Sequence, residues 1–190
     1  MRKALITGIT GQDGSYLTEL LLGKGYEVHG VARTTSTLEQ SWLAPLCRDS
    51  AIFNKRLFIY SGDLIDPSTT GELIAKVAPD EVYHLAGQSH VGRSFEIPEV
   101  TCQVTAMGTL HLLESVRAMP KPAKFFHASS SEIFGNPQQS PQTLETPLAP
   151  VNPYGCAKAF ATQMVQVYRR SFGLFACNGI LYNHESPRRG

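Results

Sequence analysis

Long apolar runs and a surplus of charge of one sign are both missing from this sequence. No stretch approaches the roughly twenty consecutive apolar residues of a membrane-spanning helix, so we expect no membrane anchor. Seventeen Lys and Arg against sixteen Asp and Glu leave a net charge of +1, without the basic surplus that nucleic-acid binding normally needs. These absences argue against membrane and nucleic-acid partners.

Cysteine is scarce, and the spacing of the cysteines matches no metal-binding or disulfide pattern. The four cysteines are scattered along the chain without a C-x-x-C pair, which argues against a metal site and against a disulfide framework. A reducing, cytoplasmic location fits this usage best. The 190 residues suffice for one hydrophobic core but are short for two, so we expect one domain over residues 1–190.

Short apolar runs alternate with segments of helical periodicity. This alternation predicts an α/β fold of the Rossmann-like, doubly wound type, with a parallel sheet covered on both faces. The runs rich in β-branched and aromatic residues predict strands over residues 4–6, 26–31, 57–60, 81–85, 124–128 and 174–181. Helical spacing predicts helices over residues 15–22, 67–77, 99–119 and 154–172. Residues 136–153 carry five prolines and predict a long loop.

Three glycines follow the first predicted strand. Gly8, Gly11 and Gly14 form a G-x-x-G-x-x-G pattern that leads straight into a helix. Such a turn lets the backbone approach a ligand closely while the free N–H groups of the helix N-terminus point at it, which suits a pyrophosphate. A plain strand-turn-helix corner remains the alternative, because glycine patterns arise by chance.

The end of the second predicted strand indicates which dinucleotide would bind. Arg33 stands where an NAD site usually has an acidic residue, and Thr34, Thr35 and Ser36 follow it. A guanidinium beside hydroxyls suits a 2'-phosphate, so NADP is favoured over NAD. The alternative is an ordinary solvated arginine.

Asp63 and Leu64 follow the third predicted strand. Asp63 is expected to accept a hydrogen bond from the adenine amino group, and Leu64 to pack on the ring. A turn or helix-cap role for Asp63 is equally compatible with the local sequence.

Candidate catalytic residues follow the fifth predicted strand. Ser130 and Glu132 lie at its carboxyl end, the edge of the sheet where α/β proteins bind ligands. Tyr154 and Lys158 are four residues apart on a predicted helix and therefore share a face. A nearby ammonium is expected to lower the pKa of the phenol, so that Tyr154 can act as a base toward a sugar hydroxyl.

The motifs together resemble the GDP-mannose 4,6-dehydratase family of extended short-chain dehydrogenases/reductases. The resemblance runs across essentially the whole chain, and its last phrase is the most discriminating. The matching stretches are "ALITGITGQDGSYL", "GDL", "GQSHV", "SSSEIFG", "PYGCAK" and "NGILYNHESPRRG".

The resemblance implies a redox-neutral dehydration of GDP-mannose or a related sugar nucleotide. Tyr154 would deprotonate the 4-hydroxyl as hydride passes to NADP, and Ser130 would hydrogen-bond the same oxygen. Glu132 would then remove the C5 proton, water would leave from C6, and hydride would return there. The substrate contacts that it implies are Ser89, Ser130, Glu132, Tyr154, Asn183 and Glu185.

The resemblance also assigns the cofactor contacts. It places the pyrophosphate at the glycine turn and the 2'-phosphate at Arg33, Thr34, Thr35 and Ser36. Its remaining positions in this chain are Gly8, Thr10, Gly11, Gln12, Asp13, Leu85, Gln88, Ser89, Lys158, His184 and Arg189.

The chain departs from the family at several points. Ser130 stands where the family usually has threonine, and Val100 where a tyrosine is common. Family members also continue past the length of this chain with most of the nucleotide-sugar domain, so that the substrate domain is expected to be mostly absent.

Apolar residues around more than one face of two predicted helices indicate a homodimer or tetramer. Burial within one chain is the alternative. The residues concerned are Val104, Met107, Leu113, Val116, Ala157, Ala161, Met164 and Val165. Two other functions also stay open: a 4-reductase or 4-epimerase of the same superfamily, and a non-catalytic NADP-binding module.

Overall fold

A computed structural model of the chain describes residues 1–33 and 38–189. Its centre is a six-stranded sheet in the order β3-β2-β1-β4-β5-β6, and each neighbouring pair of strands is parallel. The predicted α/β architecture with a parallel sheet is confirmed. The strands are Lys3–Thr7 (β1), Glu27–Ala32 (β2), Leu57–Ser61 (β3), Glu81–His84 (β4), Lys124–Ser130 (β5) and Ala176–Leu181 (β6).

The strand order creates a switch point beside β1. The chain builds β2 and β3 outward on one side of β1, then crosses over to build β4, β5 and β6 on the other. In open parallel sheets the crevice at such a reversal, outside the carboxyl ends of the strands, is where ligands bind. The loops after β1 and β4 therefore border the expected site.

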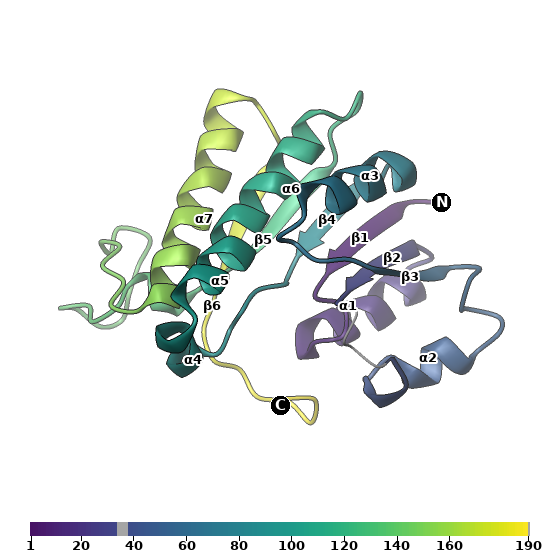
Figure 1. Ribbon diagram of the computed structural model, residues 1–190, viewed down its shortest axis with the longest axis horizontal. Helices are drawn as coiled ribbons and strands as arrows, with labels where there is room; N and C mark the ends of the chain where they lie inside the picture. Colours follow the sequence, from purple (N-terminus) through teal and green to yellow (C-terminus); the bar gives the residue numbers. More distant parts are fainter. Residues whose placement is uncertain (34–37, 190) are drawn as a thin grey trace.

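Helices cover both faces of the sheet, as Figure 1 shows, with α3, α6 and α7 on one face and α1 on the other. The helices are Gln12–Gly23 (α1), Ala44–Arg48 (α2), Pro67–Val77 (α3), Val91–Glu96 (α4), Pro98–Cys102 (α5), Gly108–Arg117 (α6) and Pro153–Ser171 (α7). Within residues 1–33 and 38–189 no helix has both the length and the apolar character to cross a membrane.

Strand alternation divides the apolar residues between two cores. On β1, Leu5 joins the core under α3, α6 and α7, whereas Ala4 and Ile6 join the core under α1. These three side chains are fully buried. Burial on both faces explains why the strand is a continuous apolar run rather than an alternating one.

Helix starts follow local capping chemistry. At α3, the Asp66 carboxylate accepts from the Ser68 N–H at 2.9 Å, and Pro67 takes the first helical position, where no donor is needed. Hydrogen bonds from the Ser68 and Thr69 hydroxyls, together with the one from the Ser68 N–H, lower the pKa of Asp66 to about 2. At α7, Asn152 and Pro153 make the same arrangement, with the Asn152 side chain accepting from the Gly155 N–H at 2.7 Å.

The single helix predicted over residues 99–119 is wrong in detail. The structure has α5, a π-helical turn Gln103–Met107 and then α6. The π turn brings the Thr105 hydroxyl to the backbone N–H of Gln88 at 3.3 Å, so the irregularity links this helix to the loop after β4. The short helices α2 and α4 were not predicted, and residues 136–152 contain neither helix nor strand, as expected.

Most residues expected at a subunit interface lie inside the chain. Five of them pack into the chain's own core and are at most 2% exposed: Leu113, Val116, Ala157, Ala161 and Val165. Their apolar character is explained by burial against the sheet, so they do not indicate a second subunit. Met107 is 40% exposed, and the same is true of Phe160.

Candidate active site

The turn between β1 and α1 brings backbone segments closer than side chains would allow. Gly8 has φ of +72°, and a Cβ there would lie 2.8 Å from the backbone nitrogen of Ala86. A Cβ on Gly14 would lie 2.4 Å from the carbonyl oxygen of Gly8. These two glycines of the sequence pattern are therefore required by packing.

The first turn of α1 opens toward a cavity. Gly11 is the N-cap and contributes no side-chain cap, and the first helical bond runs from the Ser15 N–H to the Gly11 carbonyl at 3.0 Å. Gly11, Gln12 and Asp13 line a cavity of about 660 Å³. Unpaired N–H groups at a helix N-terminus attract anions, so the turn suits the pyrophosphate of a dinucleotide.

Two adjoining cavities follow the carboxyl edge of the sheet and share Gly8, Gly11, Leu85, Gly87 and Ser89. The larger is also lined by the predicted residues Gln12, Asp13, Gly14, Ser130, Glu132, Tyr154, Lys158, Asn183, His184 and Arg189. The smaller, of about 350 Å³, is lined by the predicted residues Thr10, Arg33, Asp63, Leu64 and Gln88. The structure thus brings most of the predicted residues to one edge.

Ser130, Glu132 and Tyr154 meet at the floor of the larger cavity. Ser130 ends β5, Glu132 lies in the one-turn helix Ser131–Ile133, and Tyr154 is in the first turn of α7. Gly155 allows this approach, because a Cβ there would lie 2.6 Å from the Glu132 carbonyl oxygen. A hydroxyl, a carboxylate and a phenol therefore face the same space.

Asn152 holds the Glu132 carboxylate and was missed by the sequence analysis. Its amide nitrogen donates to Glu132 Oε2 at 2.7 Å while its amide oxygen caps α7. The residue is 6% exposed, so its orientation is set by these two bonds. The signal that could have found it is an asparagine directly before a proline at a predicted helix start.

Lys158 is buried beneath Tyr154. Its ammonium lies 5.8 Å from the centre of the Tyr154 ring and donates to the Ala128 carbonyl at 2.6 Å. Burial disfavours the charged form and lowers the pKa of Lys158 to about 8. The lysine is therefore near its protonation midpoint in mildly alkaline solution.

The expected lowering of the Tyr154 pKa is wrong for this structure. Burial raises the pKa of the phenol, a hydrogen bond with Ser130 acts in the opposite direction, and the nearby Glu132 carboxylate raises it further. Because the side chain is only 8% exposed, loss of hydration outweighs any attraction by Lys158.

Two buried histidines lie on the neighbouring strands β4 and β5, and the sequence analysis missed them as well. His84 accepts from or donates to the hydroxyls of Thr7 at 2.7 Å and Thr109 at 3.0 Å. The His127 ring lies beside it, tilted by 32°, with ring centres 5.3 Å apart. Burial lowers the pKa of His84 to about 3, and burial with the nearby Lys158 charge holds the pKa of His127 well below its usual value. Both rings are therefore neutral at physiological pH.

Residues 183–189, which follow β6, lie across the glycine turn. His184 pairs with Asp13 through Nε2 and Oδ1 at 2.8 Å, and hydrogen bonds to the Tyr182 carbonyl and Asp13 raise its pKa. Arg189 borders the larger cavity, as predicted. Glu185 is paired with Arg189 at 3.1 Å and lines neither cavity, so its predicted substrate contact is not supported by the geometry.

At the adenine end the placement is partly as expected. Arg33 borders the smaller cavity, whereas Thr34, Thr35 and Ser36 lie outside the described residues. The Asp63 carboxylate accepts from the Ile65 N–H at 3.1 Å, which is the turn role left open by the sequence. Asp63 and Leu64 nevertheless border the same cavity as Arg33.

Residues 5–190 match the protein family described as GDP-mannose 4,6 dehydratase. The chain belongs to the GDP-mannose 4,6-dehydratase family. It is 51% identical, over its full length, to a GDP-mannose 4,6-dehydratase of Vibrio cholerae, and 48% identical over 98% of its length to that of Drosophila melanogaster. It covers 51% and 48% of those two proteins, so the chain spans about half the length of the curated relatives it matches.

Solved structures with this fold include further enzymes named for sugar nucleotides. A dTDP-glucose 4,6-dehydratase of Streptomyces venezuelae with NAD bound gives a TM-score of 0.82 at 28% identity, covering 98% of this chain and 57% of that one. A UDP-glucose 4-epimerase of Brucella ovis in complex with NAD gives 0.78 at 27%, covering 96% and 51%. Both of these enzymes share the fold of this chain, and both are described with NAD.

Proposed function

We propose that this chain carries the cofactor site and catalytic residues of an NADP-dependent lyase that converts GDP-mannose to GDP-4-keto-6-deoxymannose. The observation that supports this most is that Glu132, Ser130 and Tyr154 border the same cavity as the glycine turn. The Vibrio cholerae relative, 51% identical to the chain, is named for this reaction.

The first step needs a base at the sugar 4-hydroxyl. The chemistry that NADP supplies when bound is acceptance of hydride from C4 and its return to C6. The ionised Tyr154 phenolate takes the hydroxyl proton, and Ser130, which hydrogen-bonds the phenol, hydrogen-bonds the same sugar oxygen as well. Lys158 holds positive charge below the phenol and opposes the effect of burial when Tyr154 is ionised.

The dehydration step needs a proton carrier beside C5 and C6. Glu132 removes the C5 proton, which the 4-keto group has made acidic, and returns it to the departing C6 hydroxyl as water. Asn152 holds the carboxylate by one oxygen at 2.7 Å, which leaves the other oxygen for the transfer. This second acid–base group is what a dehydratase needs in addition to Tyr154.

NADP is proposed over NAD because of Arg33. No ion pair of Arg33 is found among residues 1–33 and 38–189, and the side chain borders the smaller cavity. A guanidinium at this position is suited to a 2'-phosphate. Titration calorimetry of the chain with NADP and with NAD tests this choice, and equal affinities would contradict it.

The second candidate is a sugar-nucleotide 4-epimerase or 4-reductase, favoured by the likeness to the Brucella ovis 4-epimerase. The two candidates differ in their need for Glu132. Incubation of GDP-mannose and NADP with the protein, followed by chromatography, should give a 4-keto-6-deoxy product without net formation of NADPH. A 4-epimer, or net oxidation of NADPH in a parallel incubation that contains NADPH, would favour the second candidate. Cofactor binding without conversion of any sugar nucleotide would favour a non-catalytic module.

A homodimer is proposed as the assembly, on Met107 from the expected set and on two residues outside it, Phe160 and Val167. Met107 and Phe160 are each 40% exposed and Val167 is 42% exposed, on the helical stretch from α5 to α6 and on α7, which contact each other along one side of the sheet. Exposed apolar side chains of this size favour association. A monomeric mass in size-exclusion chromatography with light scattering would contradict it.

A further inference from the structure

Arg188 attaches residues 183–189 to α1. Its Nη2 lies 2.6 Å from Glu19 Oε1, and its Nη1 donates to Ser15 Oγ at 3.1 Å. The side chain of Arg188 is only 18% exposed, which is low for an arginine outside a core. Charge-assisted bonds to a half-shielded guanidinium are stronger than those of an exposed pair.

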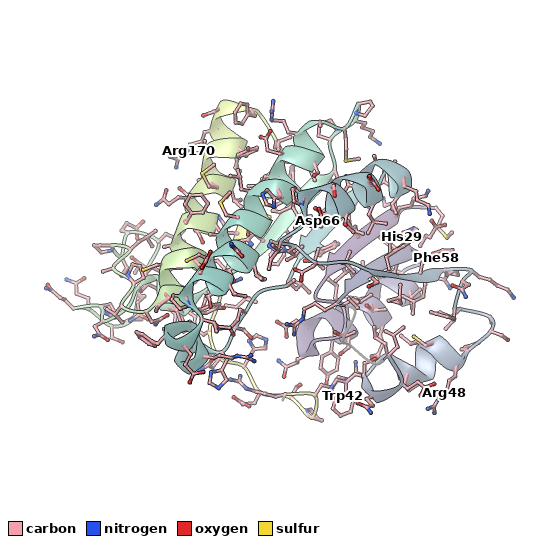
Figure 2. The ribbon with its side chains drawn as sticks, in the orientation of Figure 1. His29, Trp42, Arg48, Phe58, Asp66 and Arg170 are labelled. Carbon is pink, nitrogen blue, oxygen red and sulfur yellow. The ribbon has the colours of Figure 1, made fainter. Side chains whose placement is uncertain are left out.

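Two aromatic rings complete the surroundings of this guanidinium. Its central carbon lies 4.0 Å from the ring centre of Tyr16 on α1 and 6.0 Å from that of Trp42. Figure 2 shows Trp42 beside α2, at the side of the molecule near residues 183–189. A planar guanidinium stacks on such rings in a way that a lysine ammonium does not.

Residues 183–189 also place two side chains, His184 and Ser186, against the start of α1. His184 pairs with Asp13, and Ser186 donates to Gln12 Oε1 at 2.7 Å. Arg189 donates to the His184 carbonyl at 2.9 Å and borders the larger cavity. These contacts are more exposed than those of Arg188, with 51% of the His184 side chain and 38% of the Arg189 side chain accessible.

We propose that Arg188 is a positioning residue for the phosphate-binding end of the site. Arg188 also lines the larger cavity, but its Nη2 and Nη1 are engaged by Glu19 and Ser15 and it lies against Tyr16, so we assign its effect to the backbone of residues 183–189 rather than to a direct contact with the ligand. By holding this segment against α1, it keeps His184 and Arg189 over the free N–H groups of the glycine turn. The inference rests on the proposed binding of NADP at this turn.

The experiment compares Arg188→Ala and Arg188→Lys in the 190-residue chain, with Arg170→Ala as the control. Arg170 lies near the end of α7, far from this segment (Figure 2). Calorimetry with NADP should show affinity about tenfold weaker in Arg188→Ala, equivalent to about 1.4 kcal/mol. Arg188→Lys should lose part of this affinity, because it keeps the charge near Glu19 but not the stacking. The control should bind as the wild type does.

The single tryptophan of the chain gives an independent readout of the attachment. In Arg188→Ala, Trp42 emission should shift to longer wavelength and its quenching by acrylamide should increase, while the circular dichroism of the fold stays unchanged. Emission and quenching unchanged from the wild type would overturn the proposed attachment. Arg188→Lys provides the same test if the alanine variant does not fold.

A double-mutant cycle separates positioning from a general loss of stability. If Arg188 acts through Arg189, Arg188→Ala should weaken NADP binding much less in an Arg189→Ala background than in the wild type. Fully additive effects, or wild-type affinity in Arg188→Ala, would overturn the inference while leaving the proposed cofactor intact. Absence of NADP binding by the wild-type chain would contradict the proposed function itself, and the inference with it.

Discussion

The two ends of the larger cavity are built from opposite kinds of interaction. At the catalytic end, Lys158 and Tyr154 are 3% and 8% exposed. At the phosphate end, the His184 and Asp13 side chains that pair with each other are 51% and 36% exposed. Desolvation therefore sets the protonation states at the first end, whereas solvent-screened pairs act at the second.

At the catalytic end a charged group is buried at a cost in folding free energy, whereas at the phosphate end the charged groups stay partly in solvent. A buried lysine with one carbonyl acceptor opposes folding, whereas the proposed reaction makes use of its charge. Exposed pairs around the glycine turn can part and re-form when a ligand enters. Substitutions at the two ends should therefore have effects on turnover and on the free energy of unfolding that differ in size and in sign.

The largest effect is expected at Tyr154. Tyr154→Phe removes the proposed base while keeping the ring that fills the floor, so turnover of GDP-mannose should fall by about 10² to 10⁴. Affinity for NADP should stay within about twofold, since the change touches only the acid–base step. Product chromatography and calorimetry on the same preparation measure both quantities. Turnover equal to that of the wild type would exclude Tyr154 as the base.

Lys158→Met should stabilise the fold. Removal of a buried cation whose pKa is lowered to about 8 should raise the free energy of unfolding by on the order of 2 kcal/mol at pH 7. The sign follows because the unfolded chain keeps its proton up to about pH 10.4, so the penalty is complete below pH 8 and disappears between these values. Urea unfolding at pH 7 and pH 10 measures it, with the exposed Lys24→Met as the control. A destabilised variant at pH 7 would show that the carbonyl bond outweighs burial.

The buried histidines should make the fold sensitive to acid. The pKa of His84 falls from 6.5 to about 3 in the folded chain, so the unfolded chain binds a proton first as pH decreases below 6.5. Stability should therefore be lost by about 1 kcal/mol per pH unit for each histidine between pH 6 and 5. The variant His84→Asn with His127→Gln should show a flatter profile in urea unfolding across this range. A slope unchanged by the two substitutions would assign the acid sensitivity elsewhere.

The smallest effect is expected at the exposed pair. Asp13→Asn removes the partner of His184 and should change stability by less than about 0.5 kcal/mol. The pair needs protonated His184, whose pKa is raised, so its contribution is present at low pH and is lost as pH rises through that raised pKa. Thermal unfolding at pH 6 and pH 8 in low and high salt measures it. A change in the free energy of unfolding above about 2 kcal/mol would show that this pair contributes as much to stability as the buried groups do.

Much of the fold was accessible from local pattern. The apolar run before Gly8 and the helical spacing after Gly14 predicted β1, the turn and α1, and the structure has them at those places. Tyr154 and Lys158 were found because a spacing of four on a helix places two side chains on one face. The shared cavity of these motifs was predicted because parallel strands end at the same edge.

Other parts depend on contacts between distant residues and gave no local signal. The hydrogen bond between Asn152 and Glu132 joins residues twenty apart, and the neutral pair His84 and His127 comes from different strands. For the apolar faces of α6 and α7 the sequence left a second subunit and burial within one chain as alternatives, and most of the residues named there are buried in the chain's own core. Periodicity shows that a helix has an apolar face, but not what that face meets.

The sequence by itself determined the order of strands and helices, the glycine turn and the residue types available for chemistry, because these depend on backbone geometry and on neighbours along the chain. The tertiary structure alone decided that burial raises rather than lowers the pKa of Tyr154, that Asn152 orients Glu132, and that Arg188 joins residues 183–189 to α1. Hydration and pairing depend on every atom that surrounds a group, and those atoms come together only when the chain is folded.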